Sequence, residues 1–276
     1  MDSQYKYTYE RTSNDCYPKS DVLINLLNIT DAEDLSNAER ELVSLRAKEM
    51  TDLSINGNFD FSHLKRIHKY LFQDIFGWAG QSRTCNIAKT NLFCLAEHID
   101  TYAKDVFGQL IKENYCIDLK FNDKVEALAE LFADINALHP FREGNGRTQR
   151  EFMKQLAKVN GMNLDFTKVN EQEMIIASSE SIAGDMEKLL SMFQKIAAPI
   201  TKEEQLKAVD DYIESEKLKS KVEFDNDMRY NKNIYYIKTS QPSIHALDTV
   251  FRNAYLFDNE NKKELVRKNL FTGDLE

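Results

Sequence analysis

Apolar side chains recur at intervals of three and four residues over most of the chain, which is the period of amphipathic helices. The strongest stripe runs through residues 125–138, and helical periods also cover 37–53, 62–75, 96–113 and 148–160. Two further helices are expected between Asn170 and Pro199. Residues that commonly cap helix N-termini stand at Ser36 with Glu39, Ser62, Asn122, Asn170 with Glu173, and Thr201 with Glu204. The pattern predicts a mainly α-helical protein.

One segment departs from the helical period. Residues 83–94 alternate β-branched and polar side chains around the tip Lys89, Thr90 and Asn91, which predicts a small β-hairpin. A hairpin between long helices is either a simple connector or a flap that offers a strand edge to a peptide. Just before it, the chain's only tryptophan, Trp78, is expected to pack into a corner of the fold.

The chain after residue 199 differs in composition and predicts a second, smaller part. A charged helix to residue 219, one or two short strands within 224–239 and a last helix near 243–257 are expected there. We therefore divide the chain into a helical domain with an N-terminal helical extension, 1–199, and a small α/β appendage, 200–276.

Composition narrows the class of protein. A chain of 276 residues with 42% hydrophobic residues can bury a sizeable core, and its formal charge of −9 argues against nucleic acid or anionic membranes as the main partner. Four scattered cysteines without metal-ligand spacing are expected to be reduced thiols. No signal peptide or long apolar run is present, so we expect a soluble, cytoplasmic protein, with specialised secretion left open.

The candidate chemistry is concentrated in residues 139–150. Gly144 and Gly146 permit a crowded backbone and let main-chain N–H groups approach a ligand. A helix is expected to follow them, and the N-terminus of a helix favours phosphate. Arg147 and Arg150, three residues apart on one helix face, add planar guanidinium groups that suit phosphate oxygens. The stretch therefore predicts a polyphosphate site.

Two further residues of this stretch complete the predicted site. Glu143 has the wrong charge to contact phosphate directly, and a Mg²⁺ ion between the carboxylate and the phosphates explains it most simply. His139 is placed to accept a proton from an attacking group. A different metal site made by His63, His68 and His98 is disfavoured, because their spacing matches no zinc-hydrolase motif.

The stretch 139–150 resembles the motif of the Fic family, H-x-F-x-(D or E)-G-N-G-R-x-x-R, and agrees with it at every defined position. Residues 67–72 and 77–81 are similar to the stretch that precedes the flap hairpin of that family, and 83–93 stand where the flap belongs. The resemblance covers residues 36–195.

The resemblance implies a Fic-fold helical bundle that transfers AMP from ATP to a Tyr, Thr or Ser hydroxyl group of a target protein. His139 would be the general base, Phe141 would anchor the loop, and Glu143 would hold Mg²⁺. The anion hole would be lined by Gly144, Asn145 and Gly146, and the phosphates of the leaving pyrophosphate would be held by Arg147 and Arg150. The flap residues Lys89, Thr90, Asn91 and Leu92 would register the target backbone.

Several alternatives stay open at this point. Gly146 stands where the phosphate-transferring Doc branch has a lysine, which disfavours phosphate transfer, whereas phosphocholine transfer stays open. The family's inhibitory sequence, Ser or Thr followed after three residues by Glu and then Gly or Asn, does not occur in this chain. This predicts control by a separate small antitoxin-like protein, by cations or by a homo-oligomeric state. The alternative function is a toxin–antitoxin or binding component with weak or no transfer activity.

Overall fold

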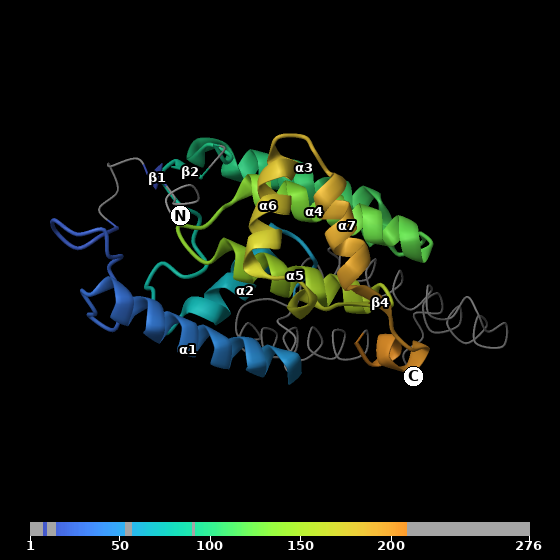
Figure 1. Cartoon of the computed structure of the whole chain (residues 1–276), viewed down its shortest axis with the longest axis horizontal. Helices are drawn as coiled ribbons and strands as arrows, with labels where there is room; N and C mark the ends of the chain where they lie inside the picture. The colour runs from blue at the N-terminus through green and yellow to red at the C-terminus, as the bar shows by residue number, and fades with distance from the viewer. Residues whose placement is uncertain (1–7, 10–14, 53–56, 90–91, 209–276) are drawn as a thin grey trace, which may run out of the picture.

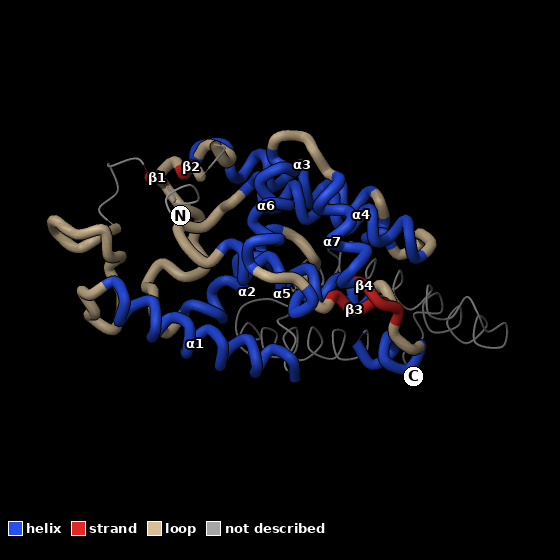
Figure 2. The backbone as a smooth tube through the Cα atoms, viewed as in Figure 1, coloured by secondary structure: helices blue, strands red, loops and turns tan. Residues whose placement is uncertain are grey.

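The computed structural model describes residues 8–9, 15–52, 57–89 and 92–208 (Figure 1). Figure 2 shows helices over most of these residues, with strands confined to short segments, so the prediction of a mainly α-helical fold is confirmed. No helix in these ranges is both long and apolar enough to cross a membrane. The helices are α1 (Ala32–Asp52), α2 (Phe61–Phe72), α3 (Ile99–Lys112), α4 (Phe121–Leu138), α5 (Asn145–Val159), α6 (Glu171–Ile182) and α7 (Glu187–Ile196), with short 3₁₀ turns at Ala96–His98, Asn114–Cys116 and Phe166–Lys168.

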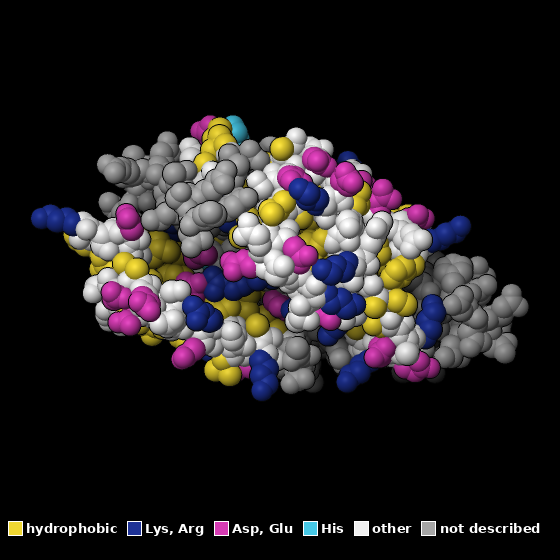
Figure 3. Space-filling view, in the orientation of Figure 1, with side chains coloured by type: hydrophobic (Ala, Val, Ile, Leu, Met, Phe, Trp, Pro, Cys, Tyr) yellow, Lys and Arg dark blue, Asp and Glu magenta, His cyan; other side chains and the backbone are white. Residues whose placement is uncertain are grey.

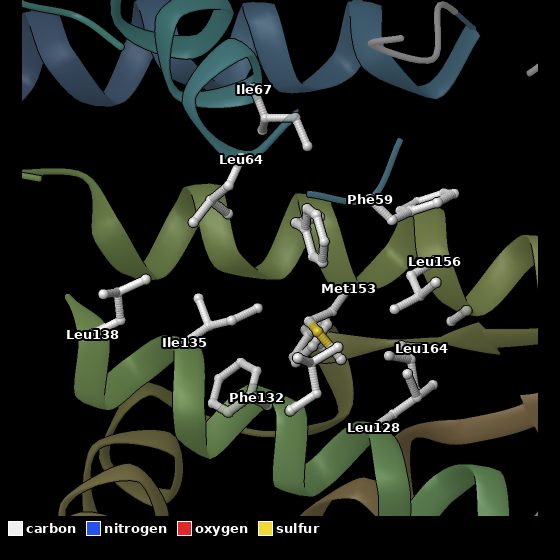
Figure 4. Close-up of a cluster of buried hydrophobic side chains, with 14 of the residues drawn as sticks. Phe59, Leu64, Ile67, Leu128, Phe132, Ile135, Leu138, Met153, Leu156 and Leu164 are labelled. Atoms are coloured by element: carbon white, nitrogen blue, oxygen red, sulfur yellow. The ribbon is translucent and has the colours of Figure 1, made fainter. Parts of the chain in front are cut away.

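The core lies where α5 packs between α2 and α4 (Figure 4). Leu64 and Ile67 of α2 lie on one side of α5, and the apolar stripe of α4 lies on the other side, next to Met153 of α5. Every member of that predicted stripe is buried: Val125, Leu128, Leu131, Phe132, Ile135 and Leu138. Burial of each large apolar side chain stabilises the fold by about 1.5–3 kcal/mol, so this contact holds α4 and α5 firmly on both sides of the loop between them.

The N-terminal caps of α1 and α2 differ from the predicted ones. The carboxylate of Asp31 accepts hydrogen bonds from two N–H groups of the first turn of α1, at 2.8 and 3.0 Å. Ser36 and Glu39 therefore lie inside the helix, and neither caps it. At α2 the cap is Asp60 and not Ser62, because the Asp60 side chain accepts the third N–H group at 2.7 Å. In both cases an aspartate earlier in the chain, five residues before Ser36 and two before Ser62, accepts from the free donors of the first turn.

The two helices that flank the motif also start at other residues than predicted. Lys120 stands at the N-cap position of α4 without a capping hydrogen bond from its side chain, and Asn122 lies inside the helix. α5 begins at Asn145 and not at Thr148, so the first turn contains Gly146. It ends as predicted before Gly161, whose positive φ of 81° lets the chain turn back.

The C-terminal half contains a small sheet that the sequence analysis missed. Strand β3 (Met162–Leu164) pairs antiparallel with β4 (Ala197–Pro199) across the end of α5. Three-residue strands are too short to show a two-residue period, which is why no pattern marked them. The capping boxes that begin at Asn170 and Thr201 are confirmed. A helix starts at residue 202, and the strands and the last helix expected beyond residue 208 lie outside the described residues.

The predicted hairpin is present as a short turn-back of the chain. Strand β2 (Ile87–Ala88) forms a bridge between Ala88 and Leu92, while the tip residues Thr90 and Asn91 lie outside the described part. The other edge of β2 pairs antiparallel with β1 (Thr8–Tyr9), a contact that the sequence did not predict. Trp78 stacks on Phe76 with ring centroids 4.5 Å apart, in agreement with a packed corner.

Candidate active site

Residues 139–144 form a tight loop between α4 and α5. His139 ends α4 in a left-handed conformation (φ 42°, ψ 58°), and Gly144 precedes α5 with φ 82°. The side chain of Asn145 fastens the loop from inside, because its Oδ1 accepts from the N–H of Phe141 and its Nδ2 donates to the carbonyl of Phe141, both at 2.8 Å. The Asn145 side chain is therefore engaged inside the loop.

His68 of α2 packs against this loop and supports it, a role that the sequence did not reveal. Its ring stacks on Phe141 at 3.8 Å, and Phe141 is buried. The Nδ1 atom of His68 accepts from the N–H of Gly80 at 2.8 Å, so the proton is on Nε2, which donates to the carbonyl of Glu143 at 2.9 Å. Burial lowers the pKa of His68 to about 3. His68 is thus a neutral side chain that fixes the backbone at Glu143.

His139 lies at the edge of the loop and is almost fully buried. Its ring stacks on Phe93 of the flap with centroids 3.7 Å apart. Burial, followed by the nearby charge of Arg83, lowers the pKa of His139 to about 3. The imidazole is therefore neutral near pH 7, which is the state that accepts a proton.

Arg83 joins the flap to the loop of residues 139–144. Its guanidinium group donates to three backbone carbonyls, those of His139 (2.8 Å), Cys85 (2.6 Å) and Cys94. The backbone N–H of Arg83 also donates to the carbonyl of Pro140, at 2.8 Å. Burial lowers the pKa of this guanidinium, yet its three hydrogen bonds to carbonyls compensate for its desolvation. The position of His139 relative to the flap thus depends on a residue that the sequence marked only as the start of a hairpin.

Three charged side chains meet beside the loop. The Glu143 carboxylate accepts from the N–H of Gly144 at 2.8 Å and lies 3.5 Å from Arg147. The same Arg147 nitrogen forms an ion pair with Glu39, which reaches the site from α1. Burial raises the pKa of Glu39, and the charge of Arg147 opposes this rise. Glu39 is therefore a member of the site and not the capping residue that its position after Ser36 suggested.

The phosphate-binding candidates lie on the first turns of α5. The N–H groups of the first turn have no carbonyl acceptor within the helix, and this end of a helix carries a partial positive charge. The Arg147 guanidinium lies over the Phe72 ring at 4.8 Å. No carboxylate of the described residues forms an ion pair with Arg150, whose nearest polar contact is the Met174 sulfur at 3.4 Å. Arg150 therefore still has guanidinium N–H groups that can donate to an anion.

Gly144 is required by two independent constraints. Its φ of 82° lies in the left-handed region that side chains disfavour. A Cβ atom there would also lie 2.3 Å from Cζ of Phe72. The loop can therefore approach α2 this closely only with glycine at that position.

A pocket of about 290 Å³ lies in front of these groups. His139, Glu143 and the start of α5 form one wall, α6 with Met174 and Ser178 forms the opposite wall, and Lys89 of the flap covers one side. Burial lowers the pKa of Lys89, and the charges of Glu143 and Glu171 oppose this. Leu92, the flap residue after the tip, is 58% exposed and available to a partner.

The donor set fits one hard divalent cation. Glu143 offers carboxylate oxygens to the pocket, and Mg²⁺ commonly takes one or two carboxylates together with substrate phosphates. No group of three His, Cys, Asp or Glu side chains in the described ranges is arranged to hold a metal by itself. His63 instead packs against the Phe59 and Phe152 rings, and His98 is exposed next to Glu97.

Comparison with known proteins shows the family that this chain resembles. A sequence model of the Fic/DOC family matches residues 58–157. The chain is 40% identical over 186 residues to the protein adenylyltransferase VbhT of Bartonella schoenbuchensis, which covers 66% of this chain and 39% of VbhT. It is 36% identical to the probable protein adenylyltransferase y4lH of Sinorhizobium fredii, over 66% of this chain and 94% of y4lH. The chain thus spans less than half of VbhT and nearly all of y4lH.

Two solved structures extend the comparison to the fold. BepC of Bartonella tribocorum with bound AMPPNP has a TM-score of 0.64 and 26% identity, covering 68% of this chain and 98% of that chain. The N-terminal Fic domain of a Bartonella quintana effector with bound ADP has a TM-score of 0.64 and 27% identity, covering 68% and 96%. Both similar structures hold an adenine nucleotide.

Proposed function

Because the chain belongs to the Fic/DOC family, we propose that it is a protein adenylyltransferase, which transfers AMP from ATP to a Tyr, Thr or Ser hydroxyl group of a target protein and releases pyrophosphate. The observation that carries the proposal is a neutral, buried His139 in one pocket with the N-terminus of α5, Arg147 and Arg150. Relatives named protein adenylyltransferases and neighbours with bound AMPPNP or ADP support the choice of ATP.

The reaction uses the residues in fixed roles. The target hydroxyl oxygen forms a bond to the α-phosphorus, and the bond from that phosphorus to the bridging oxygen of the β-phosphate breaks. His139 accepts the hydroxyl proton, while the first-turn N–H groups of α5 and the two arginines hold the phosphates in line. Glu143 would hold Mg²⁺, which supplies neutralisation of the phosphate charge.

The flap would position the target chain. Phe93 stacks on His139, so a peptide aligned along the flap from Lys89 to Leu92 would bring its hydroxyl group to the imidazole. Lys89 lines the pocket of about 290 Å³, the proposed nucleotide pocket, and would contact the phosphates at the same time. Arg83 would keep the flap and the base in one geometry.

We further propose that a second protein controls the site. The chain lacks the family's inhibitory sequence, and Arg150 keeps free donors in the described structure, so a small antitoxin-like partner fits best, with cations or oligomer state as other means of control. Such a protein would act as a toxin in the bacterial cytoplasm, or in a host cell after secretion.

The test is label transfer from α-³²P-ATP to proteins of a bacterial lysate, followed by mass spectrometry of the labelled band for an AMP adduct. His139→Ala should abolish the transfer and leave ATP binding nearly unchanged, while His98→Ala, which changes an exposed histidine, should transfer normally. Transfer by the His139→Ala variant at the wild-type rate would remove His139 as the base. ATP binding without any transfer by the wild-type chain would instead favour the binding-component alternative.

A further inference from the structure

A second cavity, of about 560 Å³, opens on the other side of the two motif arginines. It is a groove between α1 and α5 that continues to the segment after β3. Arg147 and Arg150 line both the pocket of about 290 Å³ and this groove, so these two residues lie between the two cavities. Figure 3 shows Lys and Arg side chains beside hydrophobic ones in the hollow at this part of the surface.

The groove carries more positive than negative charge. Arg40 of α1 and Lys154 and Lys158 of α5 add to the two shared arginines. The two acidic residues are already engaged: Glu151 pairs with Lys154 at 2.7 Å, and Asp165 accepts from the N–H and the hydroxyl group of Thr167 at 3.0 and 2.6 Å. Within the part of the chain that the structure describes, neither Arg40 nor Lys158 has an ion-pair partner.

The basic side chains form a continuous path. Positions 147, 150, 154 and 158 recur every three or four residues and so follow one face of α5. At a rise of 1.5 Å per residue they extend about 16 Å away from the loop. The floor beside them is apolar, made by Val43, Leu71, Leu164 and Phe166. An anion on this path would be attracted more strongly than in bulk water, because the apolar floor lowers the local dielectric constant.

Among the described residues none of those lining the groove belongs to the flap, whereas Lys89 of the flap lines the pocket of about 290 Å³. When the α-phosphorus bonds to the target oxygen, the bridging oxygen leaves with the β- and γ-phosphates. The pyrophosphate formed is still held by Arg147 and Arg150, while the modified target occupies the flap side. An exit on the flap side would require the target to leave first.

We propose that the groove between α1 and α5 is a second anion site that receives the pyrophosphate. This inference rests on the proposed function. Arg147 and Arg150 turn from the pocket toward the groove with the product, and Arg40 and Lys158 complete its binding there. The product then leaves from the face opposite the flap, independently of the target.

The test uses the full chain with the double substitution Arg40→Gln and Lys158→Met. Both side chains are exposed, so the fold is expected to be unaffected. Calorimetry should show at least fivefold weaker binding of inorganic pyrophosphate, and the pyrophosphate concentration that halves AMP transfer should rise by the same factor. The KM for ATP should stay within twofold of wild type. The control removes two exposed charges of α3, by Lys104→Met and Lys112→Met, and should change neither quantity.

Unchanged pyrophosphate affinity in the double variant would overturn the proposal. An equal rise of the KM for ATP would also overturn it, because the two residues would then act in substrate binding. So would an equal loss of pyrophosphate affinity in the α3 control, which would show only a general charge effect. A wild-type chain without transfer activity would refute the proposed function, whereas the calorimetric comparison would still decide whether the groove binds pyrophosphate.

Discussion

The substitution His68→Phe tests whether the loop geometry depends on α2. Phenylalanine keeps an aromatic ring against Phe141 but can replace neither the acceptor for the Gly80 N–H nor the donor to the Glu143 carbonyl. A buried polar group without its partner costs about 1–3 kcal/mol, so the two orphaned groups should together lower the free energy of unfolding by about 2–6 kcal/mol at pH 7. AMP transfer should fall with it, because the backbone that carries Glu143 loses its support.

The same variant should also change how the free energy of unfolding depends on pH. The pKa of His68 and that of His139 are about 3 in the folded chain and 6.5 in their ordinary state. Below pH 6.5 the unfolded chain binds protons that the folded chain does not, so this stability is complete above pH 6.5 and is lost as the pH falls toward 3. Each pH unit costs about 1.4 kcal/mol per histidine, or about 2 kcal/mol each at pH 5.

Urea unfolding followed by circular dichroism at pH 7 and at pH 5 measures both effects. His68→Phe should be less stable than wild type at pH 7 and should lose about 2 kcal/mol less between the two pH values. His68→Gln, whose amide can keep one of the two hydrogen bonds, should be intermediate at pH 7. Wild-type stability of His68→Phe at pH 7, or an unchanged loss between pH 7 and pH 5, would refute the role assigned to His68.

Three further substitutions probe the site. Gly144→Ala should destabilise the chain by about 3 kcal/mol in thermal or urea unfolding, through strain and overpacking on Phe72, whereas Gly184→Ala, with open space around it, should cost only about 1 kcal/mol. Arg83→Lys should lower AMP transfer at least tenfold, since one ammonium group cannot reach three separate carbonyls. Glu39→Gln should reduce transfer a few fold by loosening Arg147; a tenfold gain would show instead that Glu39 inhibits the site in cis.

Much of the helical architecture was readable from local pattern. The α4 stripe, the C-terminal glycine of α5 and the capping boxes at Asn170 and Thr201 are determined by residues within one or two turns, so the sequence contains all the information needed. The caps at Asp31 and Asp60 were missed because several polar residues compete near each helix start, and only the observed hydrogen bonds identify the acceptor.

The motif 139–150 by itself indicated a phosphate site, because its residue types and spacing specify the chemistry. What surrounds that motif was decided by tertiary contacts. His68 is 75 residues from Glu143 in sequence, and Glu39 is 108 residues from Arg147, so no local period connects them. The strand pairs β1–β2 and β3–β4 likewise join segments distant in sequence. The sequence by itself determined which candidate groups stand together in the motif. Only the packing of α1, α2 and the flap around the loop and α5 decided how those groups are held, because hydrogen bonds and burial depend on neighbours in space.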